Sequence, residues 1–205
     1  MQASGEPPVV FVIDDDPSYL RFIGQYLLAE DLPAKSYDCG RTFLEDCTAA
    51  HRGCALVDLA MPQIHGAELF VQMRSRGMEL PVIFLTATAD VATTAAVMRQ
   101  GAVDLIEKPC DMPMLIRRIR EALDLDSRQA AGRAVHRSQM RRLAQLTSRE
   151  RQVMDLAVEG LANKQIAMRL SISERTVEVH RARFMKKMEV ETFAHLVTRQ
   201  AKLAG

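Results

Sequence analysis

Four short segments carry acidic, hydroxyl or ammonium groups soon after apolar runs that are typical of strands. The aspartates at 14–16 follow residues 9–13, Asp58 follows 55–57, Thr86 follows 82–85, and Lys108 comes soon after 103–106. In an open α/β sheet, ligand sites gather at the carboxyl ends of the strands, so these groups are expected to meet there. Carboxylates, a hydroxyl and an ammonium in one place predict a site for phosphoryl transfer.

Each residue type suits one part of such a site. Asp14 and Asp15 would supply oxygen ligands for Mg²⁺, which usually sits between one or two carboxylates and a phosphate. Asp58 could be both a ligand and the nucleophile, because carboxylates form aspartyl-phosphates. Lys108 would cancel charge on the incoming phosphoryl oxygens, and Thr86 would donate a hydrogen bond to one of them.

The first 125 residues alternate between apolar runs and helical patterns. The candidate strands are 8–13, 34–37, 54–58, 81–86 and 103–106. The candidate helices are 17–29, 41–50, 65–76, 90–100 and 112–125, with Asp90 able to cap the fourth. This alternation predicts a parallel sheet with helices on both faces.

The charge is divided along the chain. Residues 1–125 hold 11 basic and 18 acidic residues, whereas residues 126–205 hold 16 and 8. This division indicates two domains with different partners, and nucleic acid is the candidate partner of the basic one. No apolar run approaches the ~20 residues of a membrane span, so we expect a cytoplasmic protein without a membrane partner. Residues 1–8 are expected to form a short polar lead.

The basic part begins with a segment, 126–146, that is rich in Arg, Ala and Gln and is interpreted as a linker. It could continue the preceding helix, and its sparse apolar positions favour a solvated helix over a strong coiled coil. Residues 147–203 predict four short helices, the first with a capping box at 147–150 and a stop at Gly160. Helix, short turn and basic helix form a helix-turn-helix pattern.

The motifs of the first part resemble the receiver domain of two-component response regulators. FVIDDD, DLAMP with Gly66 after it, LTATAD and EKP occur in receiver order and spacing, over roughly residues 8–125. The resemblance implies a flavodoxin-like α/β fold whose five-stranded parallel sheet has the order 2-1-3-4-5. It also implies that Asp58 accepts a phosphoryl group from a phosphohistidine on a sensor histidine kinase.

The resemblance further assigns the residues around Asp58. The implied Mg²⁺ ligands are Asp14, Asp15, Asp58 and the backbone carbonyl of Ala60. Thr86 and Lys108 would sense the phosphate, whereas Asp16 is a weaker candidate and could cap the next helix. Receivers usually carry Tyr or Phe where this chain has Leu105, and that ring is part of the switch. We therefore expect phosphorylation to survive and its coupling to output to be weaker, since a switch needs a bistable element.

The second part resembles the DNA-binding domain of LuxR-type regulators of the FixJ/NarL class, closest to the FixJ branch. The matching stretch is LTSRERQVMDLAVEGLANKQIAMRLSISERTVEVHRARFMKKM, and the resemblance covers residues 146–203. It implies an all-α four-helix domain with a helix-turn-helix. Val177, Phe184 and Met188 recur at spacings that place them on one apolar face of the basic helix.

The other face of this helix would read DNA in the major groove. Base contacts are predicted for Glu178, Val179 and Ala182. Phosphate contacts are predicted for Lys164, Arg175, Thr176, Arg183 and Lys186. His180 is ambiguous: a packed, hydrogen-bonded histidine is slightly favoured over a DNA contact.

Together these patterns predict a response regulator with a receiver domain at 8–125, a linker at 126–146 and a DNA-binding domain at 147–205. Phosphorylation would promote a homodimer that binds double-stranded promoter DNA and acts on the transcription machinery. Such a protein is a phosphoacceptor with at most slow self-dephosphorylation rather than a conventional enzyme. Two alternatives stay open: an aspartyl-phosphate hydrolase for small substrates, and a constitutive DNA-binding protein whose receiver is uncoupled or only docks a partner.

Overall fold

The computed structural model describes residues 7–88 and 91–204. Most of the expected polar lead and the expected cap Asp90 therefore lie outside the described residues. The chain divides into two compact units, Met1–Ala130 and Ala131–Gly205, and each is considered by itself.

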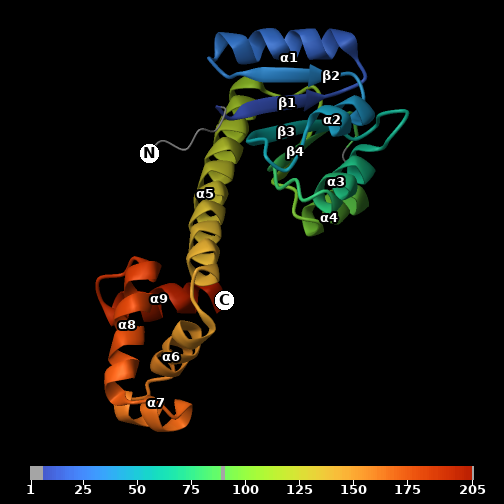
Figure 1. The fold of residues 1–205 in the computed structure, drawn as a ribbon. Helices are drawn as coiled ribbons and strands as arrows, with labels where there is room; N and C mark the ends of the chain where they lie inside the picture. The colour runs from blue at the N-terminus through green and yellow to red at the C-terminus, as the bar shows by residue number, and fades with distance from the viewer. Residues whose placement is uncertain (1–6, 89–90, 205) are drawn as a thin grey trace. The chain divides into compact units, whose positions relative to one another are not determined.

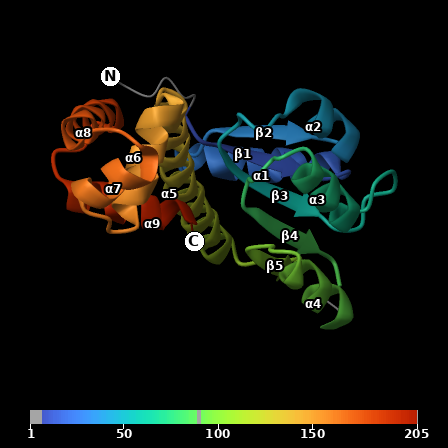
Figure 2. The ribbon, with the colours of Figure 1, turned by 60° about the horizontal axis from the view of Figure 1, so that its bottom comes forward.

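The first unit is built on a five-stranded parallel sheet. The strands are β1 (Val9–Ile13), β2 (Ala34–Tyr37), β3 (Gly53–Asp58), β4 (Val82–Thr86) and β5 (Asp104–Glu107). They lie in the order β2-β1-β3-β4-β5, as Figure 2 shows, so the predicted α/β fold is confirmed. Every neighbouring pair is parallel, which brings the carboxyl ends of all five strands to one edge.

Helices cover both faces of this sheet (Figure 1). They are α1 (Pro17–Ala29), α2 (Gly40–Asp46), α3 (Gly66–Ser75), α4 (Val91–Arg99) and α5 (Met112–Ala144). Val10 and Val12 of β1 face a core shared with α1 and α5, whereas Phe11 and Ile13 face a core shared with α2, α3 and α4. Because both faces are buried, β1 is apolar throughout rather than alternating.

Two helices differ from the lengths expected from the sequence. Helix α2 ends at Asp46 rather than at residue 50, and Cys47 adopts extended backbone angles. The N–H of Thr48 donates to Nδ1 of His51 at 3.0 Å, a local side-chain bond that competes with helix continuation. Helix α5 runs on to Ala144 through Gly132, so most of the segment interpreted as a linker is helical.

An ion pair anchors α5 at the amino-terminal end of β3. Asp126 is 1% exposed, and its Oδ2 accepts from Nε of Arg52 at 2.6 Å and from the N–H of Gly53 at 3.1 Å. Gly53 has φ of +134°, and a Cβ there would lie 1.8 Å from the carbonyl oxygen of Val9. Only glycine therefore lets the backbone approach β1 and the carboxylate this closely.

The second unit contains the end of α5 and four further helices in the described range 131–204. These are α6 (Ser148–Val158), α7 (Asn163–Leu170), α8 (Glu174–Met188) and α9 (Phe193–Ala204). Their core includes Val153, Ile166, Val177, Phe184 and Leu196. Within residues 7–88 and 91–204, no helix combines the length and apolar character needed to cross a bilayer.

Candidate functional site

The carboxyl edge of the sheet brings Asp14, Asp58 and Lys108 into direct contact. The Nζ atom of Lys108 lies 2.5 Å from Oδ2 of Asp14 and 2.6 Å from Oδ1 of Asp58. Asp14 is 1% exposed and Asp58 7%, because β1 and β3 end side by side in the middle of the sheet. One ammonium thus offsets part of the charge of two nearly buried carboxylates that would otherwise repel each other more strongly.

Burial and pairing act against each other in this cluster. Burial raises the pKa of Asp14 above its usual value of 3.8, although hydrogen bonds from Lys108 and from the N–H of Asp16 oppose the shift. Burial alone would lower the pKa of Lys108, but its bonds to Asp14 and Asp58 outweigh that effect and raise the pKa above 10.5. The lysine therefore stays charged at neutral pH.

The neighbouring aspartates occupy different environments. Asp16 is the N-cap of α1, since its Oδ1 accepts from the N–H of Ser18 at 2.8 Å. Asp15 is exposed. Among residues 7–88 and 91–204, no three His, Cys, Asp or Glu side chains are grouped closely enough to hold a metal ion. The structure thus pairs Asp14 with Asp58 but does not bring Asp15 into that cluster.

Backbone contacts hold Asp58 in place at the end of β3. Its Oδ2 accepts from the N–H of Ala60 at 2.7 Å, which leaves Oδ1 for Lys108. The N–H of Gly66 donates to the carbonyl of Leu59 at 3.0 Å, and a Cβ on Gly66 would lie 2.4 Å from the carbonyl oxygen of Asp58. The glycine after DLAMP therefore lets the loop fold back against the aspartate.

Thr86 and Leu105 lie on the adjacent strands β4 and β5. Thr86 is 5% exposed, and its hydroxyl donates to the carbonyl oxygen of Thr88 at 2.8 Å rather than to a carboxylate. Leu105 is half-buried and packs against the core under α2, α3 and α4. The pairing of β4 with β5 places Thr86 opposite Glu107, and the N–H of Lys108 donates to the carbonyl of Thr86 at 2.7 Å.

Sequence reasoning missed Tyr19, whose ring forms a further side of the cluster. Nζ of Lys108 lies 4.0 Å from the centroid of the Tyr19 ring. The Tyr19 hydroxyl contacts Sγ of Cys110 at 3.9 Å, and burial raises the pKa of this tyrosine. The position of an aromatic residue shortly after the three aspartates was a possible signal, but its pairing with residues about 90 positions away is not visible in the sequence.

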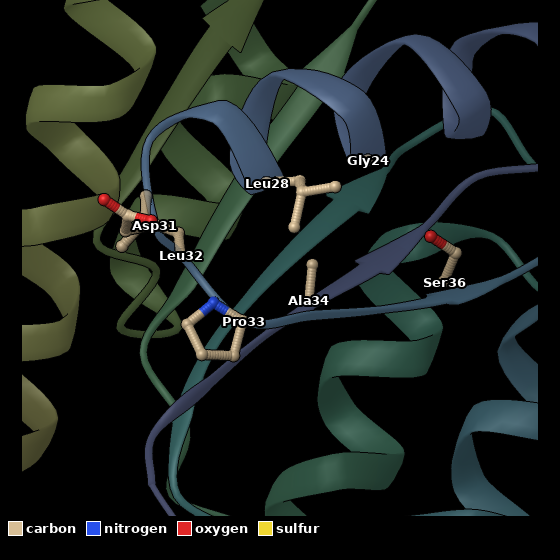
Figure 3. Close-up of a pocket in the computed structure, with 7 residues that line it drawn as sticks. All are labelled: Gly24, Leu28, Asp31, Leu32, Pro33, Ala34 and Ser36. Atoms are coloured by element: carbon tan, nitrogen blue, oxygen red, sulfur yellow. The ribbon is translucent and has the colours of Figure 1, made fainter.

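The first unit also has an open pocket of about 460 Å³ away from this cluster (Figure 3). It is lined by Gly24, Leu28, Asp31, Leu32, Pro33, Ala34 and Ser36. Leu28 of α1 and Ala34 of β2 point toward one another across it, and Leu28 is 77% exposed. The predicted site residues lie at the strand ends rather than around this pocket.

In the second unit, α8 has an apolar inner face and a polar outer one. Val177, Phe184 and Met188 are buried at 0–1% exposure, as their spacing predicted. Glu178, Val179, Ala182, Arg183 and Lys186 of α8 are all exposed, as are Lys164 of α7 and Arg175. Thr176 is half-buried, and its hydroxyl lies 2.7 Å from that of Ser173, the N-cap of α8. Seven of the eight predicted DNA contacts are thus exposed.

A buried carboxylate joins α6 to α8. Glu150 is 3% exposed; it closes the capping box with Thr147 and accepts from Nζ of Lys187 at 2.6 Å. The bond from Lys187, followed by that from Thr147, lowers the pKa of Glu150 below its usual value of 4.5. Of two adjacent lysines, Lys187 therefore faces the core and Lys186 faces outward. They also line, with Arg183, an open pocket of about 640 Å³.

His180 does not form the hydrogen bond that a packed histidine was expected to make. The side chain is half-buried, and its Nδ1 has no hydrogen-bond partner within the described part of the chain. Arg181 beside it is held by Asn163, whose Oδ1 accepts from Nη1 at 3.2 Å, and by the ring of Phe193. This bond links α7 to α8.

Comparison with known proteins places both units in described families. The profile described as "Response regulator receiver domain" matches residues 10–120, and "Bacterial regulatory proteins, luxR family" matches residues 144–199. The chain is 38% identical to the transcriptional regulatory protein FixJ of Azorhizobium caulinodans over 96% of this chain and 92% of the relative. It is 33% identical to the tetrathionate response regulatory protein TtrR of Salmonella typhimurium over 96% and 93%.

Solved structures agree with these sequence matches. The response regulator StyR superposes with a TM-score of 0.88 at 35% identity and covers 96% of this chain and 100% of its own. Full-length FixJ from B. japonicum gives a TM-score of 0.58 at 32% identity, with coverage of 96% and 97%. The likeness therefore extends over both units.

Proposed function

Because the chain belongs to the transcriptional response regulators that join a receiver domain to a LuxR-type DNA-binding domain, we propose that phosphorylation of Asp58 controls its binding to DNA. The observation that carries this proposal is the contact of one ammonium, that of Lys108, with two nearly buried carboxylates at the strand ends. A sensor histidine kinase is the proposed phosphoryl donor. The proposed domain limits are 8–125 and 147–205, with 126–146 as the linker.

The proposed reaction at Asp58 transfers a phosphoryl group from a histidine nitrogen to a carboxylate oxygen. A carboxylate oxygen of Asp58 forms a bond to phosphorus while the bond from phosphorus to the donor histidine nitrogen breaks. Lys108 already contacts Oδ1 of Asp58 at 2.6 Å, so its charge is positioned for the phosphoryl oxygens. Slow self-dephosphorylation of the resulting acyl phosphate is part of the proposal.

The acidic cluster fits Mg²⁺ by donor type and by charge. Mg²⁺ keeps several waters and needs only one or two protein carboxylates beside a phosphate, and Asp14 and Asp58 both lie within reach of a single ammonium. Asp14, Asp58, the exposed Asp15 and the backbone carbonyl of Ala60 are the proposed ligands. The ion would supply charge that offsets the phosphoryl oxygens.

Thr86 and Leu105 are the proposed switch. In the structure the Thr86 hydroxyl bonds to the carbonyl of Thr88, so drawing it to a phosphoryl oxygen would free the loop after β4. Leu105 on the next strand is half-buried against the core and could follow that movement. A leucine has no ring to exchange between two packed positions, so the free-energy difference between the states is expected to be small.

The exposed face of α8 is the proposed reading surface for double-stranded promoter DNA. Its base-reading residues would be Glu178, Val179 and Ala182. Arg175, Arg183 and Lys186 of α8 and Lys164 of α7 would contact phosphates, and Thr176 would do so through its half-buried hydroxyl. We place the protein in the cytoplasm with its DNA, acting as a homodimer on the transcription machinery.

The coupling is tested by measuring mass in solution and DNA affinity in Mg²⁺, with and without beryllofluoride as the phosphate mimic. The DNA site is first selected from a random-sequence library with each form of the protein. We expect the mimic to convert a monomer to a dimer and to tighten DNA binding, because a dimer engages two half-sites.

A bound mimic without any change in mass or DNA affinity would contradict the proposed switch. If beryllofluoride binds, as ¹⁹F NMR would establish, while mass and DNA affinity stay unchanged, the receiver is uncoupled from output. A constitutive DNA-binding protein or a partner-docking module would then replace the proposed switch.

The reading surface gives a second expected result. Arg183→Ala is expected to weaken DNA binding by a similar factor for every sequence and to reduce the slope of log affinity against log salt by about 1, because one phosphate contact is lost. Titrations at several salt concentrations measure both quantities.

A matched control for Arg183 lies on a different helix. Arg151 of α6 is also exposed and pairs only loosely with Asp155, at 3.6 Å between Nε and Oδ1. Arg151→Ala removes the same net charge and is expected to leave the salt slope unchanged. Equal slopes for both variants would contradict the assignment of α8 as the DNA-contacting face.

A further inference from the structure

The ammonium of Lys108 is enclosed by an aromatic ring as well as by carboxylates. Nζ lies 4.0 Å from the centroid of Tyr19 while it contacts Asp14 at 2.5 Å and Asp58 at 2.6 Å. A cation over the face of an aromatic ring is attracted by the ring quadrupole, and the attraction grows when water is excluded. The Lys108 side chain is only 18% exposed, so this contact is largely shielded.

Two connections hold the ring where it is. Asp16 caps α1, whose first helical residue is Pro17, and this places Tyr19 in the first turn directly after the acidic loop. The Tyr19 hydroxyl contacts Sγ of Cys110, two residues after Lys108 in the same segment. The ring is therefore tied both to the helix that follows the aspartates and to the loop that carries the lysine.

The ring differs from the carboxylates in what happens when phosphoryl transfer begins. A divalent cation held by Asp14 would compete with Lys108 for that carboxylate, because Oδ1 of Asp14 already accepts from the N–H of Asp16 and Oδ2 is the oxygen that Lys108 contacts. The ring of Tyr19 carries no net charge and has no affinity for the incoming phosphate. Its attraction for the ammonium is thus retained when the contact with Asp14 is lost.

We propose that Tyr19 is a positioning residue that keeps the ammonium of Lys108 beside Asp58 while a phosphoryl group is bound there. This inference rests on the proposed role of Asp58 as phosphoacceptor. Tyr19 touches neither the phosphoryl group nor the metal in this scheme; it acts through Lys108. The proposal requires the aromatic face and not the hydroxyl.

The first measurement needs no variant. A cation seated over a ring experiences its ring current, so the Hε resonances of Lys108 are expected to lie upfield of those of exposed lysines such as Lys35 in the wild-type protein. This shift is measured by ¹H–¹³C NMR without Mg²⁺. Lys108 resonances at the position of exposed lysines would overturn the proposal, whether or not any Tyr19 variant folds.

The second measurement compares Tyr19→Leu with Tyr19→Phe. In saturating Mg²⁺, Tyr19→Leu is expected to bind beryllofluoride about three- to tenfold more weakly than wild type, because the cation–π contact is lost. Tyr19→Phe keeps the ring and is expected to stay close to wild type. Tyr26→Leu, which removes another half-buried tyrosine of α1 without touching Lys108, controls for a general loss of packing.

The possible results separate this inference from the proposed function. Beryllofluoride binding by wild type and its loss in Asp58→Asn test the phosphoacceptor alone. With that binding established, wild-type affinity in Tyr19→Leu, or equal weakening in Tyr19→Phe and Tyr26→Leu, would overturn the role of the ring. Weakening confined to Tyr19→Leu supports it.

Discussion

Replacing Asp58 with asparagine is expected to reduce phosphorylation by a phosphohistidine donor to background and to abolish any effect of the donor on DNA binding. An amide is a poor nucleophile compared with a carboxylate, and the variant keeps nearly the same shape at the end of β3. The fold should survive, because Lys108 retains its contact with Asp14 and the repulsion between the two carboxylates disappears. Phosphate-affinity gel electrophoresis and DNA titrations measure the two effects.

Asp16→Asn is the matched control for this experiment. It removes the same charge from the same edge of the sheet, and asparagine is as good an N-cap for α1 as aspartate. We expect this variant to be phosphorylated and to respond as wild type does. Phosphorylation of Asp58→Asn at the wild-type rate would place the phosphoacceptor elsewhere and reject the proposed mechanism.

Lys108→Met is expected to separate metal binding from the response to phosphate. Without the ammonium, Asp14 and Asp58 face each other with little solvent, and the free energy of unfolding at neutral pH should fall by about 3 kcal/mol. Mg²⁺ should stabilise the variant more than wild type, since the ion no longer has to displace a lysine. The phosphate mimic should bind weakly, because its oxygens lose their cation.

The loss of stability has a defined dependence on pH. The pKa of Asp14 is already above 3.8 in the folded protein, and removing Lys108 would raise it further. A raised carboxyl pKa destabilises the folded state increasingly as pH rises through it, so the difference between variant and wild type is largest near neutrality. That difference should shrink as pH falls through the folded-state pKa values of Asp14 in the two proteins, because this carboxyl is then protonated in both folded states.

Lys35→Met provides the comparison for a lysine outside the cluster. Its ion pair with Asp46 is about half exposed on both sides, so water screens the pair and its loss should change stability very little. Chemical denaturation at a series of pH values, with and without Mg²⁺, covers both variants. A Lys108→Met protein that is as stable as wild type and gains no more from Mg²⁺ would refute the account of the charged cluster.

The strand positions and the edge that carries the site could be predicted because their signals are local, whereas the order of the strands in the sheet was implied only by the resemblance to receivers. A fully apolar strand such as β1, followed at once by acidic residues, specifies both a buried strand and the edge where its end lies. The inner face of α8 was likewise predictable, because Val177, Phe184 and Met188 repeat at helical spacing. Each of these inferences needs only neighbours along the chain.

Other features depended on particular side-chain contacts. The early end of α2 follows from a bond between Thr48 and His51, which propensity alone does not reveal. The orientation of α8 against α6 decides which of two adjacent lysines is exposed: Lys187 bonds to Glu150, and Lys186 stays free to face solvent. Asp15 belongs to the motif by sequence, yet it lies exposed beside the cluster rather than within it.

The sequence by itself determined the alternation of strands and helices along the chain, the division into an acidic and a basic part, and the strand ends that carry the site. These features follow from hydrophobic periodicity, local charge and short motifs. Only the tertiary structure decided that Lys108 bonds both Asp14 and Asp58, and that its ammonium lies against the ring of Tyr19. Those contacts join residues that are 50 to 94 positions apart in the chain, and their distances depend on sheet register and side-chain packing. Neither the register of the sheet nor the packing of side chains can be derived from a pattern along the sequence.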